Sequence, residues 1–177
     1  MLQSTIHKKD TIDLSSAPWT MHEFFAGSGL VAYGLKGMIA TVWANDISEQ
    51  KAAVYEANLG NDHFKLGDIK DVKGTELPFA HLSWASFPCQ DLSLAGSMGG
   101  IHAARSGLVW EWLRVLDEMT QKPKILLLEN VAGLLSTNNG DNYRVLHMAL
   151  VERDYDCGAI MLNASHFVPQ SRPRVFI

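Results

Sequence analysis

Residues 20–32 read Thr-Met-His-Glu-Phe-Phe-Ala-Gly-Ser-Gly-Leu-Val-Ala, and they decide the fold class of the 177-residue chain. The pattern predicts a strand over Thr20–Phe25, then a glycine turn, then a helix over Gly29–Leu35. From Gly27 to Ala32 the turn reads G-x-G-x-x-A, which is formally the dinucleotide-binding pattern. Such glycines let the backbone approach a ligand closely, although a plain strand-to-helix turn has the same composition.

Short apolar runs and longer segments of helical period alternate through the rest of the chain. We expect a short strand ahead of Gly67 and further strands at Ile39–Ala44, His81–Phe87, Ile125–Leu128, Cys157–Leu162 and Arg174–Ile177. Helices are expected at Ser48–Asn58, with Ser48 as the N-cap, at Ser106–Met119 and at Asp141–Glu152. The four aliphatic residues Ile125–Leu128 indicate a strand that is buried on both faces. This alternation predicts an α/β protein with a doubly wound, mostly parallel sheet, which binds ligands at the carboxyl ends of its strands.

The composition fits one globular domain of ordinary polarity. Hydrophobic residues make up 47% and charged residues 19% of the chain, which excludes disordered, collagen-like and coiled-coil proteins. Neither a membrane span nor the apolar region of a signal peptide is found. Two cysteines make no disulfide framework, so we expect a reducing compartment. The net charge of −4 means that any nucleic-acid contact depends on a local basic patch or on positive charge from elsewhere.

Two carboxylates follow neighbouring strands beside the glycine turn. Asp46 stands nineteen residues after Gly27 and can accept hydrogen bonds from ribose hydroxyls. Ile47 adds an apolar side chain that can lie on an adenine face. Asp68 follows the next strand, where it can accept a hydrogen bond from an adenine amino group. NAD, FAD and S-adenosylmethionine all carry an adenosine ribose, so these residues alone do not choose among cofactors.

Cys89 and Glu129 are candidates for covalent and acid–base chemistry. Cys89 follows Pro88 in a loop at the expected ligand edge, and a helix N-terminus or a nearby arginine would favour its thiolate. The alternative is a small buried hydrophobic residue, which is how we interpret Cys157. Glu129 follows four aliphatic residues, so burial would raise its pKa and suit it to donate a proton. The alternative is a strand-end carboxylate that caps a loop amide.

Arg172 and Arg174 stand two residues apart near the end of the sequence. In an extended segment their side chains point to the same side of the backbone. Two converging guanidinium groups can bind a phosphate, or they can pair with Glu129 and with a carbonyl group of the substrate. A solvated basic turn is the alternative.

In this order, the motifs resemble those of the cytosine-5 DNA methyltransferases. Three of them carry most of the resemblance, because a dehydrogenase has no need of them: Phe87–Gln90, Glu129–Val131 and the Gln-x-Arg-x-Arg pattern from Gln170. The weaker matches are Phe25–Gly29, Asn45-Asp46, Gly67–Ile69 and Arg105–Leu108. Together they extend from Glu23 to Ile177, which is nearly the whole chain.

The resemblance implies a methyl transfer from S-adenosylmethionine, without a metal, to a cytosine flipped out of double-stranded DNA. Cys89 would attack carbon 6, Glu129 would hydrogen-bond or protonate N3, and Arg174, supported by Arg172, would hold the O2 side. The implied donor-binding residues are Phe25, Ala26, Gly27, Gly29, Leu30, Asp46, Ile47, Asp68, Ile69, Pro88 and Leu108. The implied substrate-binding residues are Gln90, Ser93, Asn130 and Gln170.

The resemblance also implies a longer protein, because the family continues into a target-recognition region and two last motifs. We therefore expect residues 1–19 to be an N-terminal extension and residues 20–177 to be an incomplete catalytic domain. The chain would be a fragment, or one subunit whose partner chain carries the recognition region, and would be inactive alone. By analogy with restriction–modification enzymes, we expect a cytoplasmic protein of bacterial or phage type.

Three other functions share parts of this pattern. A tRNA cytosine-5 methyltransferase would use the same chemistry, although Phe87, where a second proline can stand before Pro88, favours DNA. A nicotinamide oxidoreductase would need only the glycine turn and Asp46. A non-catalytic subunit could bind S-adenosylmethionine for a partner, but it would have no need of Cys89 and Glu129.

Overall fold

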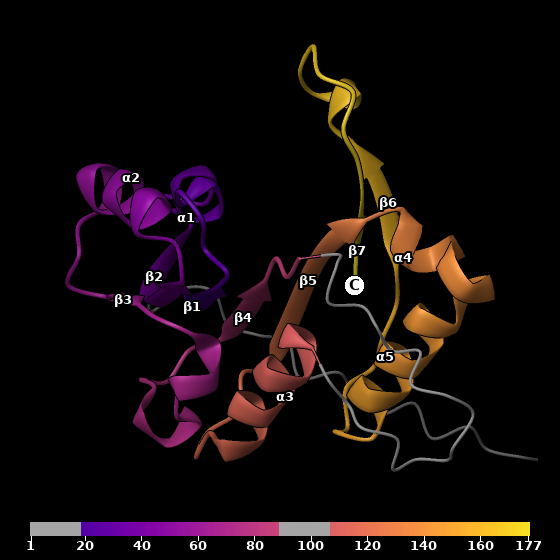
Figure 1. The fold of residues 1–177 in the computed structure, drawn as a ribbon, viewed down its shortest axis with the longest axis horizontal. Coiled ribbons are helices and arrows are strands. Elements are labelled where there is room, and N and C mark those ends of the chain that lie inside the picture. Colours follow the sequence, from indigo (N-terminus) through magenta and orange to yellow (C-terminus); the bar gives the residue numbers. More distant parts are fainter. Residues whose placement is uncertain (1–18, 89–106) are drawn as a thin grey trace, which may run out of the picture.

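The computed structural model describes residues 19–88 and 107–177, which form one seven-stranded sheet with helices on both faces (Figure 1). The strands are β1 (Trp19–Phe24), β2 (Ile39–Asp46), β3 (Phe64–Leu66), β4 (Leu82–Ala85), β5 (Ile125–Val131), β6 (Ile160–Asn163) and β7 (Pro173–Phe176). The α-helices are α1 (Leu30–Gly34), α2 (Glu49–Leu59), α3 (Leu108–Glu118), α4 (Gly133–Ser136) and α5 (Asp141–Val151). Short 3-10 helices are η1 (Ile69–Asp71), η2 (Gly74–Glu76), η4 (Thr137–Gly140) and η5 (Ala164–His166).

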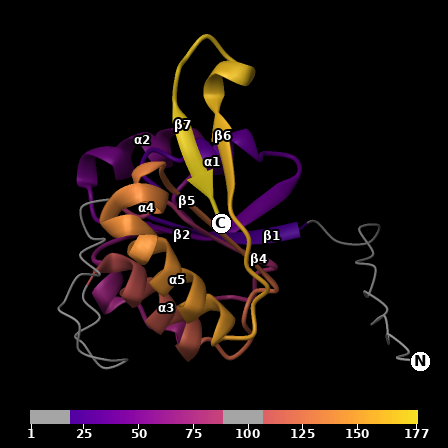
Figure 2. The same cartoon turned by 90° about the vertical axis from the view of Figure 1, so that its right-hand side faces the viewer.

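The strand order is β3-β2-β1-β4-β5-β7-β6. The first five strands in this order (β3, β2, β1, β4 and β5) pair in parallel, whereas β7 runs antiparallel to both β5 and β6. Helices α1 and α2 lie on one face of the sheet and α3 and α5 on the other (Figure 2). This arrangement confirms the predicted doubly wound, mostly parallel sheet, which is Rossmann-like.

The sheet separates two hydrophobic cores. The larger core lies between the sheet and helices α3 and α5, where Trp112, Leu116 and Leu146 are fully buried. The smaller core lies under α1 and α2 and is centred on Met21 and Tyr55. Burying one such side chain contributes about 1.5–3 kcal/mol, so these cores fix the sheet edge on which the candidate site stands.

The predicted elements agree with the observed ones within a few residues. Ser48 is the N-cap of α2 as expected, and its hydroxyl accepts a hydrogen bond from the Lys51 amide. The last two strands differ slightly: β6 begins at Ile160 rather than at Cys157, and β7 begins at Pro173.

The prediction that Ile125–Leu128 is buried on both faces is wrong. Leu128 is buried, but Leu126 and Leu127 are only half-buried and Ile125 is 39% exposed. Helices α1 and α2 contact β2 and β3, and β5 lies farther along the sheet. A run of aliphatic residues therefore does not by itself indicate that a helix covers both faces.

Candidate active site

The loop between β1 and α1 turns sharply and is tied to the end of β2. Phe25, Gly27 and Gly29 have left-handed backbone conformations, with φ of 57°, 58° and 82°. The Ala26 amide donates to the Asn45 carbonyl at 2.9 Å, and the Gly27 amide donates to the Asp46 carboxylate at 2.8 Å. A non-glycine residue such as Phe25 adopts this conformation only where surrounding contacts hold it there.

The two glycines of this loop serve different purposes. A Cβ atom on Gly29 would lie 2.5 Å from Leu59 Cδ1 and 2.7 Å from Tyr55 Cδ2, so Gly29 allows the loop to sit closely against α2. A Cβ on Gly27 would meet only Lys51, at 3.9 Å, so there the left-handed conformation is what favours glycine. Gly29 therefore supports the loop through its close packing against α2.

The last two residues of β2, Asn45 and Asp46, hold the neighbouring loops in place. Asp46 is buried, and while one oxygen of its carboxylate accepts from Gly27, the other accepts from the Ser48 amide at 2.9 Å. The Asn45 amide donates to the carbonyls of Lys65 and Gly67, which fixes the chain after β3. These contacts join three separate segments at one sheet edge.

A cavity of about 170 Å³ opens at this edge, beside the carboxyl ends of β1, β2 and β4. Seven of the predicted donor-binding residues line it: Phe25, Asp46, Ile47, Asp68, Ile69, Pro88 and Leu108. Four further residues line it that were not predicted to bind the donor, although Asn45 and Gly67 belong to matched motifs: Asn45, Lys51, Gly67 and Ser86. The remaining predicted residues, Ala26, Gly27, Gly29 and Leu30, are not part of this lining, and Leu30 is largely exposed.

The chemistry of the cavity suits a nucleoside better than a dinucleotide. Asp46 and Asp68 offer carboxylate oxygens for hydroxyl and amino groups, and Ile47, Ile69 and Leu108 offer apolar surface for a base. In dinucleotide-binding proteins the glycine-loop amides bind the pyrophosphate. The Gly27 amide already donates to Asp46, whose negative charge would repel a pyrophosphate there.

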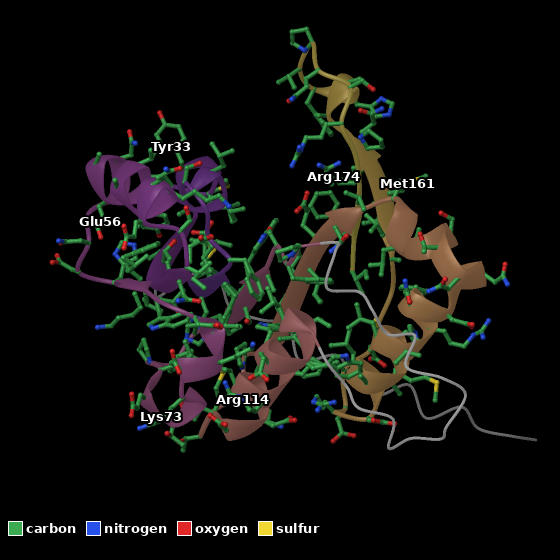
Figure 3. All side chains as sticks on the ribbon, in the orientation of Figure 1. Tyr33, Glu56, Lys73, Arg114, Met161 and Arg174 are labelled. Carbon is green, nitrogen blue, oxygen red and sulfur yellow. The ribbon has the colours of Figure 1, made fainter. Side chains whose placement is uncertain are left out.

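Glu129 and the two arginines meet where β5 pairs with β7. The Arg174 Nε atom lies 2.8 Å from Glu129 Oε1, and Arg172 Nη2 lies 4.0 Å from the same oxygen. Both arginines therefore reach Glu129, which is one of the alternatives that their spacing left open, and Figure 3 labels Arg174 beside the end of β5. The side chains of Glu129 and Arg174 are each 20% exposed, so the ion pair is strengthened by partial burial and still open to a ligand.

Asn130 uses its side chain on the protein itself. It is buried, its amide donates to the Phe87 carbonyl at 2.9 Å, and its oxygen accepts from the Val131 amide at 2.8 Å. Phe87 directly precedes Pro88. Asn130 therefore ties the end of β5 to the segment that leads into the proline–cysteine loop.

Several predicted site residues lie elsewhere. Cys89, Gln90 and Ser93 are outside the described residues, as are Arg105 and Ser106. Gln170 is exposed in the connection between β6 and β7. Cys157 is half-buried against the larger core, and burial raises the pKa of its thiol, which fits an inert cysteine.

A buried acid lies directly before the glycine loop. Glu23, on β1, is 1% exposed, and burial raises the pKa of its carboxyl group to about 7, although the Ala32 backbone and the Tyr55 hydroxyl offset part of this effect. The sequence analysis did not single out Glu23, because a single acidic residue in an apolar strand is usually a solvent-facing position. The pattern of apolar residues in the sequence does not show that a helix covers Glu23.

Residues 19–88 and 107–177 contain no group of three or more His, Cys, Asp or Glu side chains placed to hold a metal ion. No helix in these two ranges is long and apolar enough to cross a membrane.

A family model for C-5 cytosine-specific DNA methylases matches residues 19–177. The chain is 34% identical over 158 residues to the type II methyltransferase M.Bsp6I of Bacillus sp. (strain RFL6), covering 86% of this chain and 49% of that protein. It is 32% identical over 157 residues to M.HhaI of Haemophilus parahaemolyticus, covering 88% and 47%. The chain thus spans about half the length of the curated relatives it matches.

Two solved structures are similar. The Dnmt2 methyltransferase of S. pombe superposes with a TM-score of 0.71 at 26% identity, covering 89% of this chain and 49% of that one. The methyltransferase EhMeth of Entamoeba histolytica has a TM-score of 0.69 at 19% identity, covering 91% and 52%, and this likeness concerns the fold alone.

Proposed function

The chain belongs to the C-5 cytosine-specific DNA methylase family, and from this premise we propose that it binds S-adenosylmethionine and methylates carbon 5 of a cytosine in DNA. One observation carries the proposal. The Glu129–Arg174 ion pair and the Asn130–Phe87 hydrogen bond stand at the same sheet edge as the cavity of about 170 Å³. Donor and acceptor groups are thus next to the segment that leads to Cys89.

The cavity residues fit the nucleoside part of S-adenosylmethionine. Asp46 would accept hydrogen bonds from the ribose hydroxyls and Asp68 from the adenine amino group, with Ile47 and Ile69 on the faces of the base. A carboxylate can accept more than the single N–H that each Asp46 oxygen already receives. When bound, the donor supplies an electrophilic methyl group.

We propose that Cys89 and Glu129 activate the cytosine together. The Cys89 thiolate adds to carbon 6, and Glu129 donates a hydrogen bond or a proton to N3, which stabilises the charge that the addition moves into the ring. Carbon 5 then uses the displaced electron pair to take the methyl group. A general base removes the carbon-5 hydrogen as a proton, and the electron pair left behind restores the double bond and expels the Cys89 sulfur.

The arginines would position this chemistry. Arg174 lies 2.8 Å from Glu129 and so holds the carboxyl group in one orientation. Its Nη1 donates to the Pro173 carbonyl at 2.8 Å, so Nη2 would serve the O2 side of the cytosine. Arg172, at 4.0 Å and half exposed, would add positive charge to the same spot. The target base must leave the DNA stack to reach them.

We also propose that residues 20–177 act as the catalytic domain together with a recognition region on a further segment or a second chain. The matched relatives are about twice as long, and the net charge of −4 leaves much of the DNA contact to other residues.

The test is covalent trapping on duplex DNA that contains 5-fluorocytosine, with S-adenosylmethionine and with a recognition region supplied. Fluorine cannot leave as a proton, so the Cys89 adduct should accumulate. Cys89→Ser should abolish trapping, and the matched variant Cys157→Ser should retain it. Trapping that survives in Cys89→Ser would refute the assignment. Trapping on RNA but not on DNA would instead support a tRNA methyltransferase.

A further inference from the structure

Ser86, directly after β4, lies on the wall of the donor cavity. Its hydroxyl oxygen accepts a hydrogen bond from the Trp84 indole N–H at 2.8 Å. The Trp84 ring in turn contacts Phe176 on β7, with ring centroids 6.2 Å apart. Ser86 is therefore held in place by a side chain that is itself packed against the neighbouring part of the sheet.

This hydrogen bond leaves the Ser86 hydroxyl able to donate its own hydrogen to another group. Its oxygen already accepts the indole N–H, so its own hydrogen must point elsewhere. Among the described residues no acceptor receives that hydrogen. A partly buried hydroxyl on a cavity wall with an unused donor is suited to a ligand that brings an acceptor.

The order of the strands indicates which part of the donor reaches Ser86, and this step depends on the proposed function. Asp68 follows β3, Asp46 ends β2 and Ser86 follows β4, in the strand order β3-β2-β1-β4. With the adenosine at Asp68 and Asp46, the sulfonium must lie towards Pro88 to face the cytosine. The amino-acid tail branches from the sulfonium, so it lies at the β1–β4 end.

We propose that the Ser86 hydroxyl binds the α-carboxylate of S-adenosylmethionine, with Trp84 as the residue that orients it. The tail offers one strong acceptor, its carboxylate, because its amino group is protonated and can only donate. A hydrogen bond from a neutral hydroxyl to a carboxylate is of the stronger, charge-assisted kind. Ser86 would thus distinguish the complete donor from an analogue without the carboxylate.

The experiment compares calorimetric binding of S-adenosylmethionine and decarboxylated S-adenosylmethionine, which differ only in that group. Ser86→Ala should weaken binding of the first about tenfold and leave binding of the second unchanged. Trp84→Phe keeps an aromatic ring against Phe176 but loses the N–H, and it should show a smaller loss with the same selectivity.

Ser83 provides a matched control on the same strand. Its hydroxyl accepts the Trp112 indole N–H at 3.1 Å, on the face that is packed against α3. Ser83→Ala should not change the ratio of the two affinities. Equal losses for both ligands in Ser86→Ala, or no loss for either, would overturn the proposal for Ser86. The measurements are made with the recognition region supplied, and if the unmodified protein then bound neither ligand, the proposed donor binding itself would be wrong.

Discussion

The donor side and the catalytic side of the candidate site are held by different kinds of contact. On the donor side, buried Asp46 and Asn45 side chains bind backbone groups of neighbouring loops, so the cavity wall is fixed by the main chain. On the catalytic side, Glu129 and Arg174 bind each other and remain partly open to solvent.

This difference separates residues that maintain the fold from residues that take part in the reaction. A side chain that supports the backbone cannot be removed without moving the loops around it, so its loss changes both folding and binding. The contact between Glu129 and Arg174 joins two side chains and holds no loop backbone, so its loss should change the reaction more than the fold. Variants on the two sides should therefore change different measured quantities.

The largest effect should come from Glu129→Gln. If this substitution unfolded the protein, the distinction between the donor side and the catalytic side would be wrong. We expect methyl transfer by the completed enzyme to fall at least about 100-fold, because a general acid typically contributes that much or more. Donor affinity should stay unchanged by calorimetry. The control is Glu111→Gln, which also removes a partly exposed glutamate from an arginine pair, at 2.8 Å, away from the site. A similar rate loss in both variants would contradict the role of Glu129.

Glu23→Gln should remove a pH dependence that belongs to the donor side. The folded-state pKa of Glu23 is about 7, above its ordinary value of 4.5, so the folded chain keeps this proton at pH values where the unfolded chain has lost it. Stability should fall as the pH rises from about 4.5 to about 7 and then level off, by about 3 kcal/mol in total.

Urea unfolding at pH 5 and pH 8 measures this contribution. Glu23→Gln stays neutral, so its free energy of unfolding should change less between the two pH values than that of the unmodified chain. Glu56→Gln, at an exposed position labelled in Figure 3, should behave like the unmodified chain. Equal pH dependence with and without Glu23 would refute the prediction.

Asn130→Ala tests the distinction between the two sides further, because Asn130 lies on the catalytic side and yet its side chain binds a backbone group. Losing the hydrogen bond to the Phe87 carbonyl should lower the free energy of unfolding by about 2 kcal/mol and slow trapping at Cys89. Asn142→Ala also removes a buried asparagine, and it should destabilise the fold without slowing trapping once both are measured well below their melting temperatures. Slower trapping in both would show that Asn130 acts through stability alone.

The smallest effect should be that of Asp46→Ala on donor binding. The dissociation constant of S-adenosylmethionine should rise about tenfold, since the ribose loses its acceptor and the Gly27 and Ser48 amides lose theirs. Calorimetry measures it, and Asp62→Ala, outside the cavity lining, serves as the control. Unchanged affinity in Asp46→Ala would place the ribose elsewhere.

Patterns local in the chain were enough to predict much of the fold and part of the site. Strand and helix periodicity located the sheet, and the two-residue spacing of Arg172 and Arg174 predicted that their side chains point to the same side, with Glu129 as one of the possible partners. Periodicity and shared side depend on neighbours in sequence, where backbone geometry leaves little freedom. The contact with Glu129 depends in addition on the pairing of β5 with β7.

Features that depend on distant segments could not be predicted. Asn130 meets Phe87 across 43 residues, and nothing in either segment specifies that pairing. Gly29 was interpreted as a ligand-facing glycine, whereas its crowded neighbours are Tyr55 and Leu59 on a later helix. Glu23 and Ser86 likewise owe their environments to the way that separate elements pack.

The Asp46 carboxylate accepts hydrogen bonds from the Gly27 and Ser48 amides, and this link affects how a ligand binds. Because one side chain links the glycine loop to the start of α2, both segments are ordered before any ligand arrives. The conformational entropy of that loop is lost during folding, and association loses less of it. This wall of the pocket would meet its ligand as a rigid receptor.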